Sequence, residues 1–384
     1  GEKEVVEVSP AKEKYKILKR PVPLNDIHPL WNKHPNECTE EDYKNFYRKV
    51  FHDYREPLFW IHLNMDYPFN LKGILYFPKL NLNYDSLEGT IKLYNNQVFI
   101  ADNIKEVIPE FLMLLKGVID CPDLPLNVSR SALQNDGFVK KISDYITKKV
   151  ADKLTGMFKT DRENYEKYWD DINPFIKFGC LKDEKFAEKM NDFLIFKNLE
   201  GKYLTLADCL EENKEKHENT VFYITDEKEQ SQYINMFRQE KLDAVYLTQN
   251  IDSPFISYLE QKNENVKFLS ISSDLSDTFK EEVSEEDKEA MKADVDALTQ
   301  LFRKALKNEN LDVKVEKLKN QNLSSMITVS EENRRMQEMM KMYSTPGMDM
   351  SMFGAGGETL VLNYNNKLVQ HVLHHTEDEN TLKI

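Results

Sequence analysis

The sequence contains little cysteine, and its cysteines follow no pattern that would bind a metal ion. Only four occur in 384 residues, widely separated and without CxxC spacing: Cys38, Cys121, Cys180 and Cys209. We therefore predict no zinc site and no other metal site. Scattered cysteines of this kind are typical of a reducing compartment, so we expect a cytoplasmic protein.

Long hydrophobic runs and an excess of basic residues are also missing. No apolar run approaches the roughly 18 residues that a membrane-spanning helix needs, and no signal-peptide pattern opens the chain, so we expect no membrane partner. The net charge is −14. This charge argues against a nucleic-acid partner, because phosphate binding depends on clustered Lys and Arg, and it favours contact with basic or unfolded polypeptide.

Motifs of familiar enzymes are absent as well. Neither GxxxxGK[ST] nor GxGxxG occurs, so nothing in this chain cradles a nucleotide by itself. His371, His374 and His375 are not in HExxH register, and we interpret them as a solvated helix end. No Ser/His/Asp or Cys/His arrangement is evident, although residues brought together only in space would leave no such trace.

The composition favours several folded domains. Hydrophobic residues make up 40% of the chain and aromatic residues 11%, which is enough for buried cores. We predict an α/β and α+β multidomain fold. Its parts are a charged flexible lead-in, a large α/β middle domain, a helical connector, a small parallel α/β/α unit and an α+β carboxy-terminal domain: 1–20, 21–157, 158–192, 193–275 and 276–384. Because the chain starts without methionine, we expect it to be a piece of a longer protein.

Hydrophobic periodicity predicts the elements of the first half. Strands are expected at 58–63, 74–77, 90–94 and 98–101. The last two would form a hairpin around a turn at Asn95-Asn96. Helices are expected at 105–118, 129–157 and across the connector. In the first of these, four apolar residues would share one face: Ile108, Phe111, Leu112 and Leu115.

In the second half of the chain, short strands alternate with helix-length segments. Strands are expected at 221–224, 244–247 and 266–271, and the helix-length segments between them predict a small parallel sheet. A capped amphipathic helix is expected to begin near Ser284 and to end near Lys307. Further strands are predicted at 311–315, 325–329 and 360–362, with a helix over 331–343.

The stretch DLPLNVSRSALQND contains the strongest candidate for a binding residue. Ser129 is a good N-cap, so Arg130 would lie in the first turn of a helix, with Gln134 one turn later and Asn127 just upstream. A guanidinium beside the N–H groups of a first turn can bind an anion. If that anion is a phosphate, another module must present it, because no phosphate-binding loop occurs in this sequence. The alternative is a surface arginine paired with a distant carboxylate.

Methionine is concentrated near the end of the chain. Eight of the 14 methionines lie between Met326 and Met352. Such flexible, polarizable side chains recur at binding surfaces that accept many apolar partners. The alternative is an ordinary core filled with methionine. A single helical face cannot bury all of them, however, which favours the binding surface.

Several longer segments strongly resemble the heat-shock protein 90 family of chaperones, and most closely its bacterial members. These segments are PLWNKHP, EEDYKNFYRKV, KGILYFPK, GTIKLYNNQVFIADN, VIPEFLMLLKGVIDCPDLPLNVSRSALQ and GMDMSMF. The resemblance runs from about residue 25 to the end. It implies the middle domain and most of the carboxy-terminal domain, without the amino-terminal ATP-binding domain and the final dimerising helices.

The resemblance implies a role for the arginine segment. In that family the arginine of the LNxSR segment reaches the γ-phosphate of ATP, which implies this role for Arg130 and supporting roles for Gln134 and Asn127. Phe99 matches an apolar residue that docks the amino-terminal ATPase domain of the same chain. ATP and Mg²⁺ would be bound by that domain, so we expect no cofactor in this chain and no ATP hydrolysis by it alone. The basic pair that often precedes VFI is replaced by Asn96-Gln97.

The resemblance also implies binding of unfolded or partly folded client proteins. The implied contacts lie in the methionine-rich segment, with a further one on the middle domain: Met336, Met339, Met340, Met342, Phe353 and Trp60. The full-length protein would be a homodimer. Two other functions are kept as alternatives, a stand-alone α/β enzyme acting on a phosphorylated small molecule at Arg130, and a passive scaffold.

Overall fold

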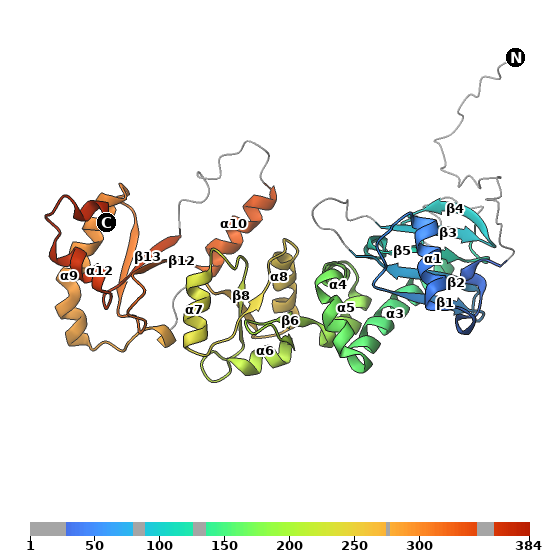
Figure 1. Ribbon diagram of the computed structural model, residues 1–384, viewed down its shortest axis with the longest axis horizontal. Helices are drawn as coiled ribbons and strands as arrows, with labels where there is room; N and C mark the ends of the chain where they lie inside the picture. Colours follow the sequence, from blue (N-terminus) through green and yellow to red (C-terminus); the bar gives the residue numbers. More distant parts are fainter. Residues whose placement is uncertain (1–27, 80–88, 126–135, 274–276, 344–356) are drawn as a thin grey trace, which may run out of the picture. The chain divides into compact units, whose positions relative to one another are not determined.

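The computed structural model describes residues 28–79, 89–125, 136–273, 277–343 and 357–384, with the backbone alone for residues 341–343. The chain divides into two compact units, the first ending at Leu194 and the second beginning at Ile195. Each unit combines helices with β-sheets, which confirms the predicted mixed α/β multidomain fold (Figure 1). Within the described residues, no helix is long and apolar enough to cross a membrane.

The first unit is built on a five-stranded mixed sheet with the order β1-β2-β5-β3-β4. Its strands are β1 (Phe59–Met65), β2 (Leu71–Phe77), β3 (Thr90–Asn95), β4 (Val98–Asp102) and β5 (Lys116–Asp120). Neighbouring strands are antiparallel except for the parallel pair β3 and β5. The predicted hairpin is confirmed, but its turn lies one residue later, at Asn96 and Gln97, whose φ angles are 49° and 66°.

Helices cover both faces of this sheet. They are η1 (Leu30–Asn32), η2 (Pro35–Glu37), α1 (Glu40–Phe51), η3 (Glu110–Leu114), α3 (Gly137–Thr160), α4 (Arg162–Lys182), α5 (Glu184–Met190) and η4 (Asn191–Phe193). On one face, Ile74 and Tyr76 of β2 pack into the cluster formed with α1 and η1. On the other face, Phe77 contacts Phe175 of α4 at a centroid distance of 5.4 Å. Burial on both faces explains the nearly continuous apolar sequence of β2.

Two predicted helices of the first unit are wrong in part. Residues 105–118 do not form one helix. They form a turn, the short η3 and the start of β5, although the four apolar residues expected on one face are all buried. The predicted helix at 129–157 does not run through Asp136, whose extended backbone (φ −76°, ψ 125°) and side-chain bonds to the N–H groups of Phe138 and Val139 start α3 at Gly137. The predicted cap Ser129 lies outside the described residues.

The second unit begins with the predicted small parallel sheet. Strands β8 (Thr220–Ile224), β9 (Val245–Tyr246) and β10 (Lys267–Ser270) are all parallel, in the order β10-β8-β9. Around them lie β6 (Ile195–Lys197), β7 (Tyr203–Thr205), α6 (Leu206–Glu212), α7 (Ser231–Gln239) and α8 (Asp252–Lys262). The strand–helix–strand repeat read in the sequence is therefore confirmed.

A second sheet completes this unit. Its strands β11 (Asp312–Glu316), β12 (Ser325–Val329) and β13 (Glu358–Asn363) have the order β11-β13-β12. They are accompanied by η5 (Asp277–Phe279), α9 (Glu285–Ala305), α10 (Glu331–Tyr343), α12 (Lys367–His374) and η6 (Thr381–Lys383). Ser284 caps α9 as predicted. One apolar cluster contains Phe222 of β8, Met326 of β12 and Val361 of β13, so the two sheets share buried side chains.

Candidate functional site

The three residues predicted to act on ATP lie outside the described residues: Asn127, Arg130 and Gln134. The segments on both sides of them are described. Before them, the side-chain amide of Asn95 donates hydrogen bonds of 3.2 Å to the carbonyl oxygens of both Cys121 and Pro122. After them, the Asp136 carboxylate caps α3. The described residues before the arginine segment are therefore bonded to the sheet, and those after it begin a long helix.

Phe99 lies on β4, next to Tyr94 of β3. Its half-buried ring packs against Tyr94 at a centroid distance of 5.5 Å, and the Lys92 ammonium lies 5.4 Å from the centre of the ring. The carbonyl oxygen of Tyr94 accepts a hydrogen bond from the N–H of Cys121 at 3.1 Å. Tyr94 thus connects the predicted docking residue Phe99 to Cys121, which directly follows β5. The docking role itself stays a prediction.

Asp120, at the end of β5, is a buried carboxylate. It was not selected in the sequence analysis. It is 2% exposed, and its Oδ2 atom accepts hydrogen bonds from Trp31 Nε1 (3.1 Å) and from the N–H of Gln97 (2.9 Å). Its Oδ1 atom has no hydrogen-bond partner among the described residues. Asp120 therefore ties the β3–β4 turn to the end of β5. The only sequence signal was an acidic residue at the end of the apolar KGVID run.

The buried cysteines are poorly suited to nucleophilic chemistry. Burial raises the pKa values of Cys121, Cys180 and Cys209 to about 12 each, so their thiols stay protonated at neutral pH. Among the described residues, no cluster of three or more His, Cys, Asp or Glu side chains could hold a metal ion. His371 and His375 stack at 4.2 Å at the end of α12.

Helix α10 is fixed to the small parallel sheet by its first turn. The carboxylate of Glu331 accepts hydrogen bonds from Tyr223 Oη (2.5 Å) and from the N–H of Ser270 (2.8 Å). Arg335 forms ion pairs with Glu331 (3.0 Å) and with Glu260 of α8 (2.5 Å). Burial opposes the charge of Arg335, but both carboxylates raise its pKa above the ordinary value. We call these five residues the α10 anchor.

The exposed side of α10 next to the anchor carries methionine. Met336 and Met339 are 45% and 56% exposed, and Met340 is partly buried. Their i, i+3, i+4 spacing places all three on one face of the helix. The two exposed side chains do not fill a core, which argues against the alternative interpretation. The side chain of Met342 and all of Phe353 lie outside the described residues.

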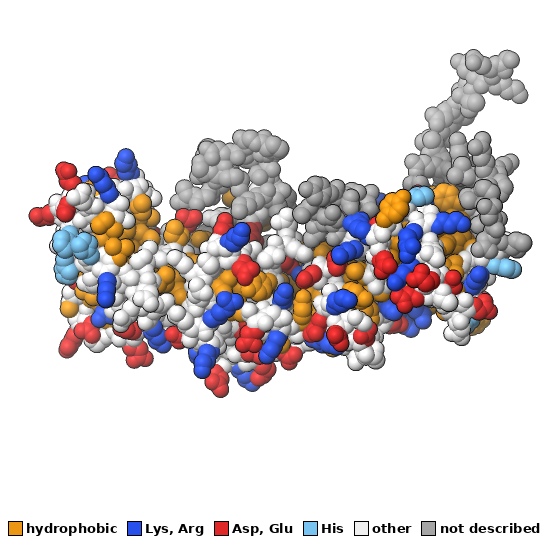
Figure 2. Space-filling model, in the orientation of Figure 1, with side chains coloured by type: hydrophobic (Ala, Val, Ile, Leu, Met, Phe, Trp, Pro, Cys, Tyr) orange, Lys and Arg blue, Asp and Glu red, His pale blue; other side chains and the backbone are white. Residues whose placement is uncertain are grey.

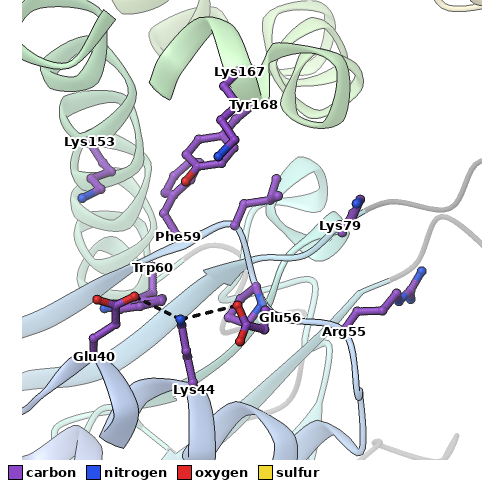
Figure 3. A pocket seen from close by; sticks show the side chains of 12 residues that line it. Glu40, Lys44, Arg55, Glu56, Phe59, Trp60, Lys79, Lys153, Lys167 and Tyr168 are labelled. Atoms are coloured by element: carbon purple, nitrogen blue, oxygen red, sulfur yellow. Dashed lines mark ion pairs between the residues drawn. The ribbon is translucent and has the colours of Figure 1, made fainter. Parts of the chain in front are cut away.

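Trp60, the predicted client contact of the middle domain, lies on β1 at the edge of a groove (Figure 3). It is partly buried, and its ring stacks on Tyr43 at a centroid distance of 5.1 Å and an angle of 26°. The groove has a volume of about 890 Å³ and includes none of the residues that flank the arginine segment. Client binding by Trp60 stays a prediction.

Asp53 fixes the loop that leads into the groove. Its carboxylate accepts hydrogen bonds from Tyr47 Oη (2.8 Å), from the N–H of Arg55 (3.0 Å) and from Lys116 Nζ (3.1 Å). Burial favours the neutral acid, but these bonds outweigh it and lower the pKa of Asp53 to about 2. The carboxylate is therefore ionised at neutral pH and stabilises the fold in that form.

Asp53→Asn should lower the free energy of unfolding by about 2 kcal/mol at pH 7, since each unit of pKa shift is worth about 1.4 kcal/mol. A carboxyl whose pKa is lowered on folding stabilises the fold above its unfolded pKa of about 3.9 and loses that contribution as pH falls toward about 2. Urea unfolding at pH 7 and pH 2.5 should therefore show the difference between the two proteins shrinking. The control Asp66→Asn removes an exposed partner of Lys72 and should change stability by less than about 1 kcal/mol at either pH.

Charges of both signs are interspersed over the face drawn in Figure 2, with apolar side chains scattered between them. No broad field of positive charge covers this face, in keeping with the net charge of −14. A local excess of basic residues, such as the one in the groove of the first unit, is therefore a departure from the surface pattern.

The chain matches a known protein family and several known proteins in sequence. The family model described as "Hsp90 protein" matches residues 2–383. The chain belongs to the Hsp90 family. It is 42% identical over 368 residues to the chaperone protein HtpG of Bacteroides fragilis (strain YCH46), covering 93% of this chain and 53% of that protein. It is 40% identical over 362 residues to chaperone protein HtpG of Porphyromonas gingivalis (strain W83), covering 91% of this chain and 52% of that protein.

A more distant relative matches a shorter part of this Hsp90 chain. Chaperone protein HtpG of Desulfitobacterium hafniense is 30% identical over 239 residues, covering 60% of this chain and 39% of that protein. The chain spans about half the length of the first two relatives. The family is therefore established.

Proposed function

We propose that this chain is the client-binding part of an ATP-dependent chaperone of the HtpG type. The observation that carries this function is the exposed methionine face of α10, in a chain that belongs to the Hsp90 family. Exposed methionines can adapt to many apolar partners, which suits a chaperone that binds unfolded or partly folded clients.

Arg130 would complete the ATPase centre in the full-length protein. ATP and Mg²⁺ would be bound by the amino-terminal domain of the same chain, and Arg130 would reach the γ-phosphate with Gln134 and Asn127 as supporting polar groups. Phe99 would help to dock that domain, and its contact with Tyr94, which accepts a hydrogen bond from Cys121 shortly before the arginine segment in the sequence, supports this assignment. Without the nucleotide-binding domain, the chain would not hydrolyse ATP.

Other properties follow from the same proposal. The full-length protein would act in the cytoplasm as a homodimer. Trp60 would add a second, smaller client contact on the first unit. Met342 and Phe353 would be further client contacts.

Replacing both Met336 and Met339 by serine should weaken client binding by about tenfold. Each exposed methionine would lose part of the roughly 1.5–3 kcal/mol that full burial of such a side chain provides. Reduced, carboxymethylated α-lactalbumin is a suitable unfolded probe, and its affinity can be measured by fluorescence anisotropy.

The matched control is Glu332→Ser, which changes an exposed polar residue of the same helix. It should leave the affinity within about twofold of the original chain. If the double variant also binds the probe normally, and circular dichroism shows an unchanged fold, the client-binding assignment of α10 is wrong.

A further inference from the structure

The groove beside Trp60 is a built cavity in the first unit that the proposed function does not require. Its walls come from α1, the loop before β1, β1 itself, α3 and α4 (Figure 3). With a volume of about 890 Å³ it falls within the size range of ligand-binding sites. All of its lining residues belong to one unit, so its shape does not depend on the placement of the second unit.

Basic side chains dominate the lining of the groove. Five are present, against two carboxylates, Glu40 and Glu56: Lys44, Arg55, Lys79, Lys153 and Lys167. This positive excess is unusual in a chain whose net charge is −14. Lys44 is neutralised by ion pairs with Glu40 (3.0 Å) and Glu56 (3.4 Å), which Figure 3 marks with dashed lines.

Three of the lysines have no such partner. Within the described part of the chain, no carboxylate forms an ion pair with Lys79, Lys153 or Lys167. Lys153 instead lies 5.9 Å from the ring centre of Phe59, and Lys167 lies 5.9 Å from that of Tyr168. Lys79 is near enough to Asp171 to oppose the increase that burial causes in the pKa of that carboxyl. These ammonium groups are therefore available to a ligand that brings its own negative charge.

The base of the groove is aromatic. Phe59 packs against Tyr168 at a centroid distance of 5.6 Å, whereas the next residue of β1, Trp60, points to the other face of the strand and stacks on Tyr43. Pro57 and Leu58 add further apolar surface. A ligand that fits this lining has carboxylates to meet the lysines and an apolar side chain to cover the rings.

This combination distinguishes between the two main classes of acidic macromolecule. A nucleic acid presents an uninterrupted row of phosphates, which Glu40 and Glu56 on the same lining would repel. A peptide can place its acidic residues on one side and its backbone N–H groups toward the two glutamates. The lining therefore fits a peptide better than a polyphosphate chain.

We propose that this groove binds an acidic peptide segment of a partner protein. The carboxylates of the segment contact Lys79, Lys153 and Lys167, an apolar side chain of the segment covers Phe59, and the segment continues past the exposed part of Trp60. This site is independent of the methionine face of α10, which belongs to the other unit. It assigns the first unit a charge-selective partner in addition to unfolded clients.

Tryptophan fluorescence provides a direct test. Trp31 and Trp169 are each 4% exposed, whereas Trp60 is partly exposed at the groove, so acrylamide should quench mainly Trp60. The probe is a synthetic eight-residue peptide of Glu and Asp with Phe-Leu at its centre. Binding should protect Trp60 from quenching and raise the anisotropy of the labelled peptide.

Charge-reversal variants test whether the peptide binds at the groove or responds only to the net charge of the protein. Lys79→Glu combined with Lys167→Glu changes two exposed groove residues and should lower the affinity for the peptide by roughly tenfold. The matched control combines Lys140→Glu and Lys148→Glu, which are exposed on α3 outside the groove and change the net charge equally. The control should retain the affinity of the original chain.

Three results would overturn the proposal. The first is that the control pair lowers the affinity for the peptide as much as the groove pair does. The second is that the same peptide with Gln and Asn in place of its acidic residues binds equally well. The third is that an eight-nucleotide oligothymidylate binds more tightly than the peptide and protects Trp60, which would assign the groove to nucleic acid. None of these results depends on ATP turnover or on client binding by α10.

Discussion

Replacing Arg130 by alanine should lower ATP turnover about a hundredfold when the chain is joined to the amino-terminal domain of a bacterial relative. Removal of one preorganised donor that stabilises transition-state charge typically costs about 10²–10³ in rate, and arginine fingers reach about 10³–10⁵ in other phosphoryl-transfer systems. We expect the lower value because this ATPase family is slow. Nucleotide affinity should change little, since the amino-terminal domain would provide the binding pocket.

The control for this experiment is an exposed arginine elsewhere in the chain. Arg238→Ala changes an exposed residue of α7 and should leave turnover unchanged. Gln134→Ala should produce a smaller decrease than Arg130→Ala, because a neutral amide stabilises developing charge less than a guanidinium does. Equal turnover in the Arg130 variant and the unaltered protein would contradict the assignment of the arginine.

Local periodicity predicted the helices and strands best where each of them buries only one face. The helix at 331–343 and the strand at 325–329 were predicted with the observed boundaries. At 105–118 the same reasoning failed, because four apolar residues at helical spacing are also compatible with a turn followed by a buried strand. There, Gly117 is needed where β5 meets β2, since a Cβ atom would lie 2.6 Å from the carbonyl oxygen of Ile74. Such a contact between distant strands leaves no local pattern.

The candidate sites were predictable as residue types but not as surfaces. The sequence indicated that the methionines near residue 340 bind partners, but it could not show which of them are exposed. Which methionines are exposed depends on how α10 is held, for example by the hydrogen bond from the Tyr223 hydroxyl to Glu331, 108 positions later in the chain. The basic groove was missed for the same reason, because its lysines come from segments that are adjacent only after folding. Trp60 was the one lining residue that the sequence analysis selected.

Replacing Glu331 by alanine should release the first turn of α10 at a cost of about 3 kcal/mol, the second large effect that we expect. The change removes the acceptor for Tyr223 and Ser270 and leaves Arg335 with one carboxylate instead of two. Truncating one partner of a partly buried charged network typically costs about 3–5 kcal/mol. Hydrogen exchange of the amides of residues 334–340 should accelerate by about a hundredfold, since about 1.4 kcal/mol corresponds to a factor of ten.

Two comparisons separate the α10 anchor from the general stability of the unit. Glu332→Ala changes the exposed neighbour and should leave exchange unchanged, whereas Glu331→Gln keeps an acceptor and should lose less protection than the alanine variant. If the anchor directs Met336 and Met339 outward, the alanine variant should also bind the unfolded probe less tightly, because a loosened helix must be ordered again on binding. Faster exchange with undiminished client affinity would show that the methionines act without the anchor. Unchanged exchange would show that α10 is held by other contacts, such as those of Arg334 with Ser272 and Thr225.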